Sequence, residues 1–247
     1  MISLLQSEWL KLRKSKFVFA AILLGPLITF FYALTLQPDK FGLEKTFLWE
    51  FLIAFTTLLY ALYFLPLATG ILAGLLCRYE HQNGGWKQLL ALPVTRNRVF
   101  LAKYAILIFT VLAIQLLYLL AIWTSGVLKG AEGPFPVMLL WKSILGGWIA
   151  TFPLLALQLW MSMLFKSFAA PFAVNVAFTL PAILAVNSEK FGPLYPWAQP
   201  FLMMYVSKDA GNDTFFVPWE QVLTVAGGSF LLFFFGGLLY FRRKENI

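Results

Sequence analysis

The sequence has few charged side chains, a single cysteine and a single histidine. Only 12% of its 247 residues are charged and 60% are apolar, whereas soluble domains carry about 25% charge, so the composition argues against an ordinary globular enzyme. Cys77 alone cannot form a disulfide within the chain, and His81 alone excludes a His-x-x-x-His zinc site. Because no Gly-Lys pair occurs, the chain cannot hydrolyse ATP by the phosphate-loop mechanism. The remaining class is a protein that crosses a membrane several times.

Six apolar runs reach the length that a transmembrane helix needs, which is about 20 residues. They cover residues 17–36, 47–77, 99–123, 142–165, 168–187 and 219–241. The connections between them are too short for a soluble catalytic domain of typical size. The sequence therefore predicts an all-α integral membrane protein, in which a single six-helix domain (17–247) follows a short interfacial helix (1–16).

Basic residues are distributed unevenly between the two sets of connecting segments. With the N-terminus inside, the inner segments hold 13 of the 19 Lys and Arg residues. The outer segments hold only Lys40, Lys45, Lys129, Lys142, Lys190 and Lys208. Because positive residues accumulate on the cytoplasmic side, we expect a multi-pass protein of a bacterial cytoplasmic membrane with both termini in the cytoplasm.

The first sixteen residues have the periodicity of a short amphipathic helix. Ile2, Leu5, Trp9 and Leu12 recur at spacings of three and four. The basic residues on the other faces are Lys11, Arg13 and Lys14. This pattern predicts an elbow helix in the inner interface, with its basic side toward anionic lipid headgroups. The alternative is a positive cluster that only sets the topology.

The second apolar run is too long for a simple crossing and must tilt, kink or protrude. About 31 helical residues rise to roughly 46 Å, against a hydrocarbon core of about 30 Å. Pro66 offers a kink, and Gly70 and Gly74 form a step that lets another helix approach closely. The partner in that approach is either a second subunit or a helix of the same chain.

A short helix is predicted between the second and third runs. The Asn83-Gly84-Gly85 segment breaks the long helix, and Trp86, Leu89 and Leu90 then repeat at helical spacing until Pro93 ends them. Thr95 is a candidate N-cap for the next span. We expect the apolar face to dock into a groove of a soluble partner, whereas the alternative is an ordinary basic inner loop.

These segments together resemble the permeases of ABC-2-type ATP-driven transporters. The residues that carry the resemblance are Glu80, Gly84, Leu89, Leu90, Leu92, Pro93, Val94, Thr95 and Arg96, with residues 8–16 resembling the elbow of the same family. The resemblance implies that residues 80–98 contain a coupling helix gripped by an ATP-binding subunit. It also implies a second permease in the complex. ATP and Mg²⁺ would then be bound by the partner, and this chain would need no cofactor of its own.

Because the apolar spans and the outer connection 188–218 offer aromatic surface and few charges, we expect an amphipathic cargo taken from the bilayer. The chain is similar to the small permeases of lantibiotic and bacitracin self-protection systems, and we expect export of such a peptide. Two other classes stay open, namely an integral-membrane enzyme and a membrane scaffold or channel subunit. No pattern in the sequence points to nucleic acid.

The longest outer connection, residues 188–218, is rich in proline and aromatic residues. It is too apolar for a solvated loop, and a re-entrant or rim-covering hairpin would place Tyr195, Pro196 and Trp197 near the headgroups. In the family that the chain resembles, such a hairpin caps the outer mouth. The alternative is a loop that rests on the bilayer surface.

Polar residues inside the predicted spans are few. Gln115, Gln158 and Asn175 lie well within them. For Gln158 and Asn175 we favour hydrogen bonds between helices over contacts with a substrate.

Overall fold

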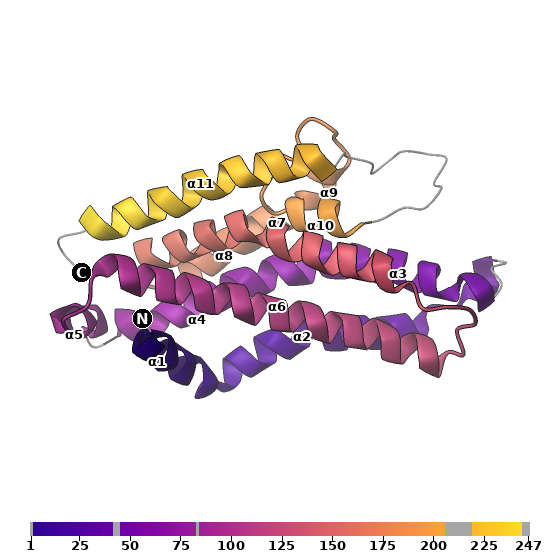
Figure 1. Ribbon diagram of the computed structural model, residues 1–247, viewed down its shortest axis with the longest axis horizontal. Coiled ribbons are helices and arrows are strands. Elements are labelled where there is room, and N and C mark those ends of the chain that lie inside the picture. Colours follow the sequence, from indigo (N-terminus) through magenta and orange to yellow (C-terminus); the bar gives the residue numbers. More distant parts are fainter. Residues whose placement is uncertain (1, 42–44, 83, 206–218, 244–247) are drawn as a thin grey trace.

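The computed structural model describes residues 2–41, 45–82, 84–205 and 219–243, and all regular structure in these residues is helical. The long helices lie side by side along one axis (Figure 1). Six helical segments of the described residues are long and apolar enough to cross a membrane. They are Lys16–Thr35, Lys45–His81, Arg96–Leu128, Val137–Leu164, Ala169–Val186 and Glu220–Arg243. Each coincides with one of the six predicted runs, so the predicted number and order of spans are confirmed.

The first two helices are a short N-terminal helix and the first apolar span. Helix α1 (Ile2–Arg13) ends just before α2 (Lys16–Thr35), with Ser15 in an extended conformation between them. Helix α1 packs on α6, α2 and α4, and α2 packs mainly on α6. The short helix predicted at the N-terminus is therefore present and rests against the bundle.

The second span is interrupted by a wider turn. After η1 (Pro38–Phe41) and η2 (Lys45–Phe47), the chain continues as α3 (Leu48–Leu59), the π-helical turn η3 (Tyr60–Phe64) and α4 (Leu65–His81). The backbone N–H of Leu65 donates to the carbonyl of Tyr60, five residues earlier. Because Pro66 has no N–H to continue the regular ladder, the turn before it widens. The irregularity expected at Pro66 is thus found one turn ahead of it.

The third span begins after a short helix at the end of the bundle that also carries α1 (Figure 1). Helix α5 (Gly85–Ala91) is followed by α6 (Arg96–Leu128), whose 33 residues extend over about 50 Å. The hydroxyl of Thr95 accepts a hydrogen bond from the N–H of Arg98 at 3.4 Å, so the predicted N-cap is confirmed. We call this end of the bundle the α1–α5 end.

The remaining helices complete the bundle. They are α7 (Val137–Leu164), α8 (Ala169–Thr179), α9 (Ala182–Val186), α10 (Gln199–Met204) and α11 (Trp219–Arg243). Helix α7 is central, because it packs against α4, α6, α8, α10 and α11. The last described turn of α11 returns to the α1–α5 end (Figure 1).

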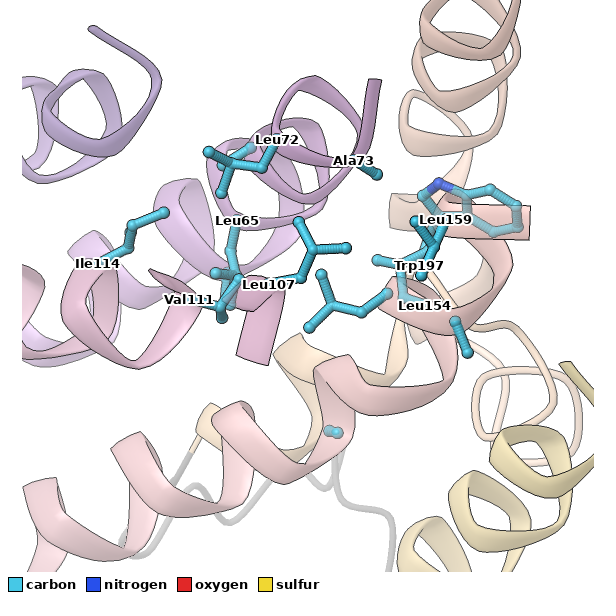
Figure 2. Packing of buried hydrophobic residues seen from close by; sticks show 14 of the residues in the cluster. Leu65, Leu72, Ala73, Leu107, Val111, Ile114, Leu154, Leu159 and Trp197 are labelled. Atoms are coloured by element: carbon cyan, nitrogen blue, oxygen red, sulfur yellow. The ribbon is translucent and has the colours of Figure 1, made fainter. Parts of the chain in front are cut away.

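One part of the hydrophobic core, which elsewhere contains aromatic side chains and residues of other helices, consists of aliphatic side chains from three helices. Figure 2 shows where they meet: Leu65, Leu72 and Ala73 of α4, Leu107, Val111 and Ile114 of α6, and Leu154 and Leu159 of α7. All of these side chains are buried. Close packing of this kind fixes how α4, α6 and α7 meet, and so fixes the side chains at the α1–α5 end.

Candidate functional site

Four charged residues gather inside the α1–α5 end. Glu8 and Lys11 come from α1, Glu80 from the last turn of α4 and Lys103 from the third turn of α6. The Nζ of Lys11 donates to Glu8 Oε1 at 2.7 Å and to Glu80 Oε1 at 2.6 Å. The Nζ of Lys103 lies 2.7 Å from Glu8 Oε2 and 2.9 Å from Glu80 Oε1. We call these four residues the buried charge cluster.

The buried charge cluster is electrically balanced and largely removed from solvent. Lys103, Glu8 and Glu80 expose 0%, 1% and 3% of their side chains, while Lys11 exposes 27%. The ammonium of Lys103 also donates to the carbonyl of Leu76 at 3.1 Å. Since an unpaired buried charge is costly, two cations and two anions in mutual contact hold α1, α4 and α6 in one relative position.

Glu80 and Lys103 make contacts in the buried charge cluster that were not predicted from the sequence. Glu80 was expected near the surface that a partner binds, but it is buried and paired inside the chain. Lys103 was only one of the 13 basic residues counted with the inner segments. A lysine inside an apolar run is itself a signal, because such residues pair with an opposite charge. The sequence does not show which carboxylates pair with Lys103, because Glu8 is 95 residues away along the chain and Glu80 is 23 residues away.

Trp86 connects α5 to three other helices. Its indole is buried, and its Nε1 donates to Nδ1 of His81 in α4 at 3.2 Å. The ring lies 5.2 Å from that of Phe241 in α11, and the Lys103 ammonium of α6 lies 5.6 Å from its centre. His81 Nε2 lies 2.8 Å from the carbonyl of Ser162 in α7. Because Nδ1 accepts the indole hydrogen bond, the imidazole proton is at Nε2 and is donated to Ser162.

The apolar face of α5 packs on the chain's own helices, whereas the prediction directed it toward a soluble partner. Trp86 is buried, and Leu89 and Leu90 are partly buried against the same core, so this face binds the chain's own bundle. The outward-facing residues of the segment are Lys87, Gln88, Ala91, Leu92 and Pro93. The expectation that Trp86 is open to a partner is therefore wrong. The reason is that an apolar face next to a membrane bundle has an apolar surface available within the same chain.

The other residues of this segment shape its ends. Gly84 has a φ of +70°, a left-handed conformation that permits the sharp turn between α4 and α5. Pro93 follows the end of α5, as predicted. The guanidinium of Arg96 donates to the carbonyls of Phe241 and Arg242 at 3.1 and 3.2 Å, so a cation lies at the C-terminal end of α11.

The inward face of α1 is also different from the predicted apolar stripe. Leu4, Glu8 and Leu12 are buried, whereas Ile2 and Trp9 remain exposed. Of the predicted basic residues, Lys11 joins the buried charge cluster, and Arg13 and Lys14 are exposed. Glu8 replaces Leu5 at the centre of the buried face because Lys103 offers it a partner.

Gly70 and Gly74 of α4 allow a close approach of α8 and of Phe168, the residue before α8. A Cβ on Gly70 would collide with the side chain of Asn175, and one on Gly74 would lie 2.8 Å from Cδ2 of Phe168. The close approach therefore occurs within one chain.

A polar network joins α4, α7 and α8 to the segment before α10. Asn175 Oδ1 accepts hydrogen bonds from Gln158 Nε2 and Trp197 Nε1, both at 2.7 Å, and its Nδ2 donates to the carbonyl of Pro66 at 3.0 Å. Gln158 and Asn175 thus bond between helices, as we favoured. Trp197 is buried within the described part of the chain.

The first half of the predicted outer hairpin folds back onto the bundle. Pro196 is buried, Trp197 stacks on Phe178 at 4.9 Å, and all six residues of α10 are buried. The Tyr195 hydroxyl donates to the carbonyl of Phe178 at 2.6 Å, and partial burial raises the pKa of this tyrosine. Residues 206–218, the second half of the predicted hairpin, lie outside the described residues.

The fold and the six apolar spans define a multi-pass membrane protein. A family model described as "ABC-2 family transporter protein" matches residues 4–182, well over half of the chain. The chain therefore belongs to the ABC-2 family of transporter membrane components. The match includes α1 from its third residue onward, all of α5 and all four residues of the buried charge cluster. Comparisons with curated proteins and with solved structures give no match.

Proposed function

We propose that the chain is the permease subunit of an ATP-driven exporter and receives the motion of a separate ATP-binding subunit at its α1–α5 end. Members of the ABC-2 family generally work with such a subunit. The observation that carries the proposal is the joining of five helices at this end. The buried charge cluster connects α1, α4 and α6, and Trp86 adds α5 and α11.

Force applied to α5 would reach the spans through Trp86 and the glycine turn. The outer side of α5, with Lys87, Gln88 and Leu92, is open to a partner. Because Trp86 is held by α4 and contacts α6 and α11, α5 cannot shift without moving their ends. Glu80, Leu89 and Leu90 transmit this motion inside the permease instead of touching the partner.

The α1–α5 end is the cytoplasmic end in this proposal. It carries the densest basic segments of the chain, which the positive-inside rule assigns to the cytoplasm of a bacterium. A second permease would complete the pathway, as a homodimer or as a related heterodimer. Apolar side chains exposed on α11, among them Leu231, Leu232 and Phe235, offer a surface for that subunit or for lipid.

The proposed cargo is an amphipathic molecule taken from the bilayer, with lantibiotic-like peptides as the first candidates. The polar groups of Gln158 and Asn175 are engaged within the chain. Exposed surfaces of the spans are mainly apolar and aromatic. Such surfaces suit a lipid-soluble cargo better than a small charged solute.

The test is capture of the ATP-binding subunit after expression of the chain with the products of its neighbouring genes. Leu92, which is 55% exposed beside α5, is changed to Asp. We expect partner capture to fall by at least about tenfold, together with transport-coupled ATPase activity, since a central interface anchor contributes about 2 kcal/mol or more. The matched control is Leu128→Asp, at the far end of α6, where the leucine is 68% exposed.

The outcomes separate the alternatives. Loss of capture in Leu92→Asp but not in Leu128→Asp supports docking on α5. If Leu92→Asp keeps both the partner and full ATPase activity, α5 is not the docking element. If no ATP-binding protein is captured by the unmodified chain, the scaffold or channel interpretation replaces the permease.

A further inference from the structure

An apolar groove opens on the surface where α2, α4 and α8 meet. Its walls include Phe17, Ala20 and Leu24 of α2, Ile71 and Leu75 of α4, and Phe172 of α8. The groove has a volume of about 360 Å³, and pockets that hold small organic ligands measure about 300–1,000 Å³. From Phe17 to Leu24 it follows α2 for about 10 Å along the helix axis. The side chains of Phe17 and Leu24 are 68% and 51% exposed, so the groove is open toward the membrane.

The groove leads directly into a basic hollow at the α1–α5 end. This second space measures about 400 Å³ and is lined by Lys14, Lys16 and Arg78 together with polar groups. Phe17, Leu75 and Arg78 line both spaces. The apolar and basic parts are therefore adjoining sections of one surface depression.

The cations of the hollow have no counter-charge in the described part of the chain. Lys14, Lys16 and Arg78 are exposed and form no ion pair with a described carboxylate. The two carboxylates closest to this end in sequence, Glu8 and Glu80, already pair with Lys11 and Lys103. Three uncompensated positive charges at the mouth of an apolar groove match a ligand with one anionic end and one apolar tail.

We propose that this depression is a binding site for an anionic glycerophospholipid. An acyl chain lies in the α2–α4 groove between Phe17 and Leu24, and the phosphate lies among Lys14, Lys16 and Arg78. Basic pockets between helices at the membrane surface bind anionic headgroups, and each Lys or Arg contributes about 1 kcal/mol. The bound lipid spans the joint between α1 and α2, next to the buried charge cluster. This site does not depend on the proposed ATP-driven function.

The test measures lipid binding to the whole chain by native mass spectrometry, with dioleoyl phosphatidylglycerol as the probe and dioleoyl phosphatidylethanolamine as the zwitterionic comparison. The charge variant is Lys16→Gln with Arg78→Gln, and the groove variant is Ala20→Trp, which fills the apolar part. The matched control is Arg98→Gln, an exposed cation at the same end that does not line the depression. None of these residues belongs to the buried charge cluster.

We expect phosphatidylglycerol to bind more tightly than phosphatidylethanolamine. Loss of two cations should weaken its binding by about thirtyfold. Ala20→Trp should weaken binding of both lipids, whereas Arg98→Gln should change neither. Inorganic phosphate at millimolar concentration should not displace the lipid, because it cannot fill the groove.

Any one of five results would overturn the proposal. Equal binding of the two lipids, or unchanged binding to the charge variant, would remove the headgroup assignment. Competition by phosphate, or no effect of Ala20→Trp, would remove the acyl-chain groove. The same spectra report oligomeric state, and dissociation of a dimer by Ala20→Trp without a change in lipid binding would show that a second copy of the chain occupies the groove.

Discussion

Replacing Lys103 by methionine should destabilise the protein more than any surface substitution of a basic residue. The change removes an ammonium that contacts both Glu8, at 2.7 Å, and Glu80, at 2.9 Å, and that is fully buried. The cluster then holds two carboxylates and only Lys11, so one buried negative charge is uncompensated. Breaking a buried ion pair in this way costs about 3–5 kcal/mol.

This cost converts into a measurable shift of the melting temperature. For chains of 150–250 residues, 1 kcal/mol changes Tm by about 2–4 °C, so Lys103→Met should lower Tm by about 6–20 °C. The assay is thermal unfolding of detergent-purified protein followed by size-exclusion chromatography. The matched control is Lys87→Met on the outer side of α5, which should stay within about 2 °C because surface substitutions change stability by about 0.5 kcal/mol.

A double variant tests whether charge balance is the cause. Lys103→Met with Glu8→Gln leaves Lys11 and Glu80 as a neutral pair at 2.6 Å. The double variant should therefore be more stable than the sum of the two single effects, by about 0.5–3 kcal/mol. Strict additivity, or a Tm of Lys103→Met equal to that of Lys87→Met, would refute the argument that paired burial holds these helices together.

Three further predictions concern the rest of the chain. Purified alone, the protein should show no ATPase activity above background, and robust turnover by a verified single-component preparation would contradict the permease assignment. Reporter fusions should place Gly133 outside and Lys166 inside, and either result on the opposite side would break the six-span topology. Asn175→Leu leaves the N–H donors of Gln158 and Trp197 without their acceptor at 2.7 Å. Because each buried donor without a partner costs about 1–3 kcal/mol, Tm should fall by several degrees. An unchanged Tm would show that this network does not stabilise the fold.

The spans could be predicted from the sequence because length and hydropathy decide them. A run of about 20 apolar residues has few alternatives to a membrane helix, since every backbone polar group must be satisfied within it. Local turn chemistry was equally readable. The Gly84 turn, the end of α5 before Pro93 and the Thr95 cap all depend on neighbouring residues alone.

The candidate site could not be predicted in the same way, because its contacts join residues far apart in the sequence. Periodicity showed that Trp86, Leu89 and Leu90 share a face, but periodicity does not say which apolar surface covers that face. The structure supplies Phe241 and His81 from two other helices, and Trp86 is therefore enclosed within the chain.

The contacts of the buried charge cluster could not be predicted from the sequence for the same reason. Lys103 within an apolar span and Glu80 at the end of another both required a partner, and composition alone allowed several pairings. The fold selects Glu8 because α1 packs along α6. Glu80 of α4 and Lys103 of α6 already balance in charge, and α1 adds Glu8 and Lys11 as a second neutral pair, in which Lys11 contacts both carboxylates. It follows that α1 is held by buried ion pairs as well as by apolar packing. Any motion that separates α1 from α4 must expose or re-pair these charges, and a driven transporter would supply the energy for that step at this end.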